Sequence, residues 1–196
     1  MSFRNNSRFW RMKKKSRLGS NIIAAVWGIA EASFFFIVPD VFLSYIALQS
    51  YKKALIASVY ALVGAICGGL IIYWWAYHNE SGTIVFLDLI PGISPELIAQ
   101  GKVLFQQDMF YGMLQGSVTG IPYKIFSAQA GIERVSIISF ILASIPARFI
   151  RFAIVPLATS YISRTLLKSK SYLAKTRILC GFWIVFYIGY FYKVGW

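Results

Sequence analysis

Charged residues are scarce in this chain, and acidic residues are the scarcest. Of 196 residues, 14% are charged, whereas an average soluble domain carries about 25%. Only seven residues are Asp or Glu. Hydrophobic residues make up 58% of the chain and occur in long blocks, and the mean hydropathy is +0.61. This composition excludes an ordinary soluble domain and predicts an integral, all-helical membrane protein.

Residues suited to metal or covalent chemistry are also few. The two cysteines, Cys67 and Cys180, lie inside apolar runs, so we expect buried, unreactive thiols with no disulfide. The one histidine, His78, ends an apolar run, where an interfacial position is expected. The sequence shows no His/Cys cluster, nucleophile motif or phosphate-binding loop. We therefore expect no metal, no cofactor and no enzymatic activity.

Positive charge is abundant but confined to particular segments. The net charge is +13, and seven basic residues fall within residues 1–20, with a second basic stretch from Arg164 to Arg177. Basic flanks of apolar segments mark the cytoplasmic side of a membrane and attract anionic lipid, so lipid is a simpler partner than nucleic acid. Residues 1–20 are predicted to form a cytoplasmic tail. It is either disordered or lies on the lipid surface through Phe9 and Trp10.

The stretch from Gly116 to Gly131, GSVTGIPYKIFSAQAG, is apolar but broken. A full span needs about 20 apolar residues. Here Gly116, Gly120 and Pro122 interrupt the helix, and Gly131 adds a further break. Residues 112–131 are therefore predicted to form a re-entrant hairpin that enters from the outside. Broken backbone persists in a membrane only against protein or a wet cavity, so this stretch is expected to line the working site.

Residues 21–50 repeat that pattern. Pro39 and Asp40 break an apolar run near its middle, and basic residues flank it on both sides, with Lys52 and Lys53 at the far end. Two basic ends predict a hairpin that enters from the inside. The alternative is one kinked span, which would place Lys52 and Lys53 outside.

Three other segments, 54–77, 135–162 and 178–192, are predicted to span the membrane. Small residues at Gly64, Gly68 and Gly69 predict a close approach by another helix. The connection 78–111 is expected outside, with Ser94 capping a helix and one interfacial helix over 103–114. The whole is an all-α polytopic fold with two inverted re-entrant hairpins and about three spanning helices. Paired Pro-broken segments of this kind indicate a transport site between them.

Five ionisable residues lie in apolar surroundings: Glu31, Asp40, Lys124, Arg148 and Arg151. A charge at the centre of a membrane helix costs about 2.5–3.5 kcal/mol, so each is a candidate functional residue with an expected partner. Both acids precede residue 50 and all three cations follow residue 120, so ion pairs are predicted if the hairpins meet.

Two interpretations of these five residues stay open. In one, the two arginines share a helix face and bind a phosphate, Lys124 adds positive charge, and the acids act as gates that could bind protons. In the other, the residues form a structural salt-bridge network. Arg151 could alternatively extend to the membrane interface.

Four stretches carry a resemblance to a known family: WGIAEASFFFIVPDVFLSYIAL (27–48), VGAICGGLIIYW (63–74), GIPYKIFSAQAG (120–131) and ASIPARFIRF (143–152). The sequence resembles the DedA/VTT (SNARE-associated Golgi) superfamily, and within it the YqaA-like branch. The combined E-x₈-D, PYK-x-F-x₄-G and R-x₂-R patterns carry this resemblance. The sequence differs from the family pattern at Gly69, where many members have Asp. It also differs at Tyr123-Lys124, where DedA proper has an arginine-bearing motif.

The resemblance implies a single VTT-like domain over residues 21–196, with two facing re-entrant helices enclosed by spanning helices. It also implies lipid translocation. Bacterial relatives are linked to recycling undecaprenyl phosphate across the inner membrane with dependence on the proton-motive force, and eukaryotic relatives to phospholipid scrambling. Glu31, Asp40, Arg148 and Arg151 match the family's charged residues. We thus expect a flippase-like or scramblase-like protein of the bacterial inner membrane for an anionic lipid. A proton- or ion-coupled solute carrier and a non-catalytic membrane organiser remain alternatives, and the oligomeric state is open.

Overall fold

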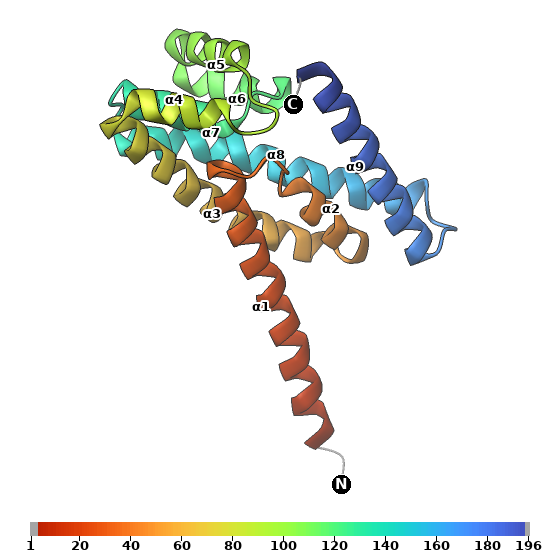
Figure 1. Ribbon diagram of the computed structural model, residues 1–196. Helices are drawn as coiled ribbons and strands as arrows, with labels where there is room; N and C mark the ends of the chain where they lie inside the picture. Colours follow the sequence, from red (N-terminus) through yellow and green to blue (C-terminus); the bar gives the residue numbers. More distant parts are fainter. Residues whose placement is uncertain (1–3, 195–196) are drawn as a thin grey trace.

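The computed structural model describes the backbone of residues 4–194 and the side chains of residues 18–193. This part of the chain is all-helical, as predicted, and contains no strand (Figure 1). Its helices are α1 (Arg4–Ser33), α2 (Asp40–Gln49), α3 (Tyr51–His78), α4 (Glu80–Asp88), α5 (Pro95–Gln107), α6 (Met109–Thr119), α7 (Tyr123–Ile132), α8 (Ile137–Thr165) and α9 (Tyr172–Val194). The side chains of the basic tail, with the lipid contact expected of Phe9 and Trp10, lie outside the described side chains.

The backbone of α1 runs without interruption from the basic stretch into the apolar one, so residue 20 is not a boundary between structural elements. The N-terminal part of α1 extends away from the other helices (Figure 1). Its C-terminal part packs closely on α3.

Within residues 4–194, three helices are long and apolar enough to cross a membrane, which makes the chain a membrane protein. They are α3, α8 and the 172–193 portion of α9. They correspond to the three predicted spans: α3 and α9 contain the spans 54–77 and 178–192, whereas α8 begins at Ile137, two residues after the predicted start of the span 135–162. Pro156 lies inside α8 and cannot donate a hydrogen bond to the carbonyl of Phe152. Ser58 of α3 donates to that carbonyl instead, at 2.6 Å, so the two helices are joined at the proline.

Small residues allow the close packing of α1 on α3. A Cβ at Gly64 would collide with the carbonyl oxygen of Ala25, and a Cβ at Gly28 would collide with that of Ala61. Gly68 meets α1 in the same way, at the carbonyl of Ile29. The predicted close approach of another helix is confirmed at Gly64 and Gly68, whereas Gly69 meets the Tyr123 side chain of α7.

Two breaks interrupt the helices where prolines predicted them. The first break covers residues 34–39 and ends at Pro39, the residue before α2. The second covers residues 120–122, where Gly120 adopts φ +91° and Pro122 precedes α7. A positive φ is strained for residues with a Cβ, so glycine suits the end of α6.

Two glycines predicted as breaks lie within helices instead. Gly116 is inside α6, where a Cβ would collide with the ring of Phe126. Gly131 is inside α7, where a Cβ would collide with the carbonyl oxygen of Tyr73 on α3. Both predictions were wrong because these glycines permit close helix contacts rather than interrupting the backbone.

The connection between α3 and α7 is more helical than predicted. Ser94 does cap α5, accepting a hydrogen bond from the Leu97 amide at 3.4 Å. The single helix expected over 103–114 is divided at Asp108, whose side chain accepts from the Tyr111 amide at 2.8 Å and caps α6. The prediction of buried cysteines was also wrong, because Cys67 and Cys180 are exposed on the helix surfaces.

Candidate functional site

The two breaks lie beside each other, and most of their residues are half-buried or buried. Lys124, in the first turn of α7, donates a hydrogen bond from Nζ to the carbonyl of Phe35 in the first break, at 2.8 Å. Trp27 of α1 donates to the carbonyl of Ile37 at 2.9 Å, and the Val38 amide donates to the Tyr187 hydroxyl of α9 at 2.8 Å. Side chains from three helices therefore satisfy backbone groups that the break leaves without helical partners.

Glu31 and Arg148 form an ion pair that is almost completely buried. Their exposed fractions are 5% and 1%. The Arg148 guanidinium also lies over two aromatic rings, 4.8 Å from the centre of Tyr123 and 4.7 Å from that of Phe152. Such contacts stabilise a desolvated cation by up to about 2 kcal/mol. Arg148 is thus in contact with α1, α7 and its own helix, while its buried Nε has no hydrogen-bond partner.

Asp40 and Arg151 form a second ion pair that is open on one side. Nε of Arg151 donates to Oδ2 of Asp40 at 2.9 Å. The Asp40 side chain is 1% exposed, but that of Arg151 is 24% exposed. The other oxygen of Asp40, Oδ1, is buried and has no hydrogen-bond partner. This pair therefore keeps both an accessible cation and an unsatisfied carboxylate oxygen.

The predicted pairing of acids with cations is confirmed for both arginines. They lie one turn apart on α8, yet Arg148 faces α1 and Arg151 faces α2. Lys124 differs from expectation, because no carboxylate lies within salt-bridge distance of it in the part of the chain that the structure describes. Its partner is a backbone carbonyl, which the sequence cannot indicate.

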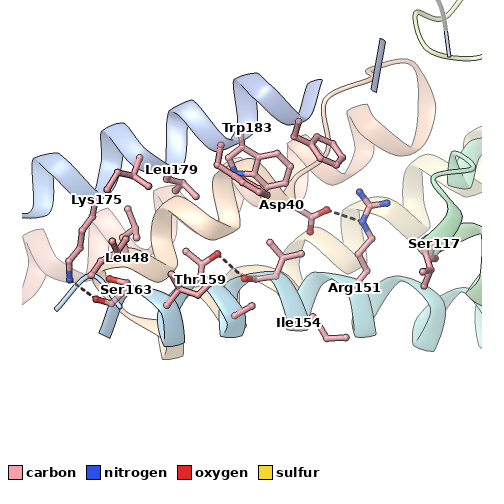
Figure 2. A pocket seen from close by; sticks show the side chains of 18 of the residues that line it. Asp40, Leu48, Ser117, Arg151, Ile154, Thr159, Ser163, Lys175, Leu179 and Trp183 are labelled. Atoms are coloured by element: carbon pink, nitrogen blue, oxygen red, sulfur yellow. Dashed lines mark hydrogen bonds and ion pairs between the residues drawn. The ribbon is translucent and has the colours of Figure 1, made fainter. Parts of the chain in front are cut away.

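A groove of about 550 Å³ runs between α8 and α9, with α2 behind it. Asp40 and Arg151 lie at one end and Lys175 at the other, and Figure 2 shows this arrangement along the two helices. The walls between the charged ends are mostly apolar and include Ile154 and Leu179. The groove can therefore accept hydrocarbon along its length and an anion at either end.

A smaller, more polar cavity of about 90 Å³ lies beside the two breaks. Glu31, Lys124 and Arg151 line it, together with tyrosines of α9. Arg151 lines both the groove and this cavity, as do Gly120 and Phe186. Arg148 is not among the residues that line either one.

The contribution of α9 was missed by sequence reasoning, which treated it only as a short last span. Trp183 donates to the Ser44 hydroxyl at 3.0 Å, and Tyr190 donates to the Gly92 carbonyl at 2.9 Å. Trp183, Tyr187 and Tyr190 have the i, i+4, i+7 spacing of one helix face. Polar aromatic residues along one face of an apolar span could have indicated that this face packs on other parts of the protein, which are α2, the first break and the turn at Gly92.

Comparisons with known proteins add one relative of unknown function. An uncharacterized protein of Haemophilus influenzae is 28% identical over 133 residues, which cover 64% of this chain and 64% of that protein. The match thus covers less than two thirds of the relative's length. No protein-family model matches the chain, and no solved structure matches it. What the fold and site define is a class, a helical membrane protein with two ion pairs beside paired helix breaks.

Proposed function

We propose that the protein moves the anionic headgroup of a membrane lipid between the two leaflets, as a flippase or scramblase rather than as an enzyme. The observation that carries the proposal is the position of Arg151. It is the partly exposed cation of the site, and it lies where the apolar groove meets the polar cavity. A lipid needs both environments at once, because its chain is apolar and its headgroup is charged.

Arg151 has the donors to hold a phosphate while it stays near Asp40. Its hydrogen bond to Asp40 uses Nε. A guanidinium carries five N–H donors, and two of them can bind a phosphate side by side. An arriving headgroup would therefore share Arg151 with Asp40 and then replace it.

The helix breaks support an anion at this position. α2 begins at Asp40 and α7 begins at Tyr123, and the Lys124–Phe35 hydrogen bond joins the first turn of α7 to the break that precedes α2. The N-terminal end of a helix carries a partial positive charge. Broken helices with such ends at mid-membrane are typical of transporter binding sites. We propose that residues 21–50 and 112–131 are re-entrant hairpins of this type.

The two ion pairs have different roles in this proposal. The enclosed Glu31–Arg148 pair holds α1 against α8, whereas the Asp40–Arg151 pair opens to admit the headgroup. Oδ1 of Asp40 has no partner and is the place where a proton would bind. Protonation there would weaken the ion pair and release Arg151, which is the form of proton coupling that we propose.

The charge distribution supports an orientation and a location. Lys52, Lys53 and the basic stretch from Arg164 to Arg177 adjoin helix ends, and basic flanks favour the cytoplasmic side. We propose a bacterial inner membrane, with the N-terminus and these segments in the cytoplasm.

Reconstitution of the purified full chain tests the proposal. Liposomes would contain a fluorescent anionic phospholipid in both leaflets, and a membrane-impermeant quencher would be added outside. The proposal predicts that the inner-leaflet probe becomes quenched faster than in protein-free liposomes, and faster than a zwitterionic probe. Folded protein that leaves the anionic probe at the protein-free rate would refute it.

A further inference from the structure

The α8–α9 groove has a length that fits one leaflet of a membrane. Nζ of Lys175 donates to the carbonyl of Ser163 at 2.7 Å, so Lys175 marks one end of the groove on α8. Arg151 marks the other end, twelve residues earlier on the same helix. At about 1.5 Å of rise per residue the two cations are about 18 Å apart along α8. One leaflet is about half of a hydrocarbon core of roughly 30 Å.

The groove lies among surfaces that face lipid. On α8, Ile154 and Leu157 are exposed, and on α9 so are Ile178 and Phe182. Both helices are among the candidate membrane spans, so the neighbouring medium is hydrocarbon rather than water. A volume of about 550 Å³ also lies within the range of about 300–1,000 Å³ that is usual for small-molecule sites. The occupant that reaches such a groove is a lipid chain.

The charges of the groove select the headgroup. The titratable residues that line it are Asp40, Arg151 and Lys175, and Asp40 is already paired with Arg151. Lys175 uses one of its three donors to cap the C-terminal end of α8 at Ser163, which leaves two for a ligand. Its end of the groove therefore favours an anion.

We propose that the α8–α9 groove binds one hydrocarbon chain of an anionic lipid, with the headgroup at Lys175 and the chain end near Asp40 and Arg151. The lipid is then held in the orientation it has in its own leaflet, before the headgroup moves to Arg151. The inference rests on the proposed function, because it describes the site where the same lipid binds before its headgroup is moved. It adds a chain site and assigns headgroup binding to Lys175.

Photo-crosslinking in nanodiscs tests the position of the chain. Two phosphatidylglycerol probes would carry a diazirine, one at the end of an acyl chain and one next to the headgroup. The end probe should label residues near Ile154 and Phe186, and the headgroup-side probe should label residues near Leu167 and Lys175. Labels spread over all exposed helix faces, or found in the reverse order, would overturn the proposal.

Two substitutions at Ala158 and a control at Leu142 test whether labelling requires an open groove. Ala158→Trp fills the groove without entering the core, since Ala158 is exposed to it, and should abolish both sets of labels. Ala158→Leu, a smaller change, should reduce them. Leu142→Trp, on an exposed face of α8 outside the groove, should leave them unchanged. Folding of each variant is checked by gel filtration, and persistent groove labels in folded Ala158→Trp would contradict the proposal.

Lys175→Gln tests the headgroup assignment. Glutamine can still donate to the Ser163 carbonyl but carries no charge. The preference for an anionic over a zwitterionic probe should fall about fivefold, which corresponds to about 1 kcal/mol for one basic residue facing anionic lipid. Lys168→Gln, in the same basic stretch but not lining the groove, should preserve the preference. An unchanged preference in Lys175→Gln would remove Lys175 from the site.

The outcomes separate the two proposals. Groove labelling without any headgroup movement in liposomes would refute the proposed function and leave the chain site standing. Headgroup movement without groove labelling would refute the chain site alone.

Discussion

Replacing Arg148 with methionine should destabilise the protein by about 3–5 kcal/mol, because it leaves the Glu31 carboxylate buried without its cation. The structure places this change at the costly end of that range. Glu31 is 5% exposed, and the substitution also removes the guanidinium from the Tyr123 and Phe152 rings. For a chain of this length a loss at the upper end of that range corresponds to a fall of about 10–20 °C in the unfolding midpoint. Thermal unfolding in detergent, followed by circular dichroism, measures it.

The double variant Glu31→Leu with Arg148→Met is the control. It removes both charges and leaves no buried ion, so most of the lost stability should return. The reasoning is refuted if the single variant unfolds at the wild-type temperature. It is also refuted if the double variant is as unstable as the single one, because packing rather than the unpaired charge would then explain the loss.

Further predictions concern packing, the join between the breaks, and topology. Gly64→Val should prevent stable folding because a Cβ there meets the backbone of α1. Gly181→Val is the control and should be tolerated, because nothing lies within 4 Å of a Cβ at that position. Expression level and gel filtration compare the two variants. Lys124→Met should cost about 1–3 kcal/mol, since it leaves a partly buried carbonyl of the first break without its hydrogen bond, and unfolding midpoints test this. In a cysteine-free background, Lys52→Cys should react with an impermeant thiol reagent only from the inside and Glu133→Cys only from the outside. The reverse side for either would remove the corresponding hairpin.

Helix type and the positions of the breaks could be predicted because they depend on local features. A run of about 20 apolar residues identifies a span whatever its neighbours are. Proline cannot donate to a helix and therefore often ends one, as at Pro39 and Pro122, although α8 accommodates Pro146 and Pro156 in its interior. Glycine is ambiguous, since it weakens a helix and also admits a close neighbour. Gly116 and Gly131 were misjudged because each meets a residue of another helix, Phe126 of α7 and Tyr73 of α3 respectively, and the sequence does not show which helices pack together.

The site could be predicted only in part, for a similar reason. Opposite charges at separate positions predicted ion pairs, but spacing does not say which acid meets which arginine. Residues three apart point about 60° apart around a helix with 3.6 residues per turn, so Arg148 and Arg151 reach different neighbours. That difference makes one arginine enclosed and the other accessible. The groove depends on the distance between α8 and α9, which no local pattern encodes.

Headgroup movement by Arg151→Gln is the measurement that tests the central claim most directly. Glutamine keeps a donor for Asp40 but removes the charge that would bind the headgroup. Arg164→Gln, which changes a cation that lies over the Tyr51 ring and not in the groove, is the matched control. In liposomes with equal amounts of folded protein, the account predicts the protein-free rate for Arg151→Gln and the wild-type rate for Arg164→Gln. Transfer of the anionic probe at the wild-type rate by Arg151→Gln would contradict it.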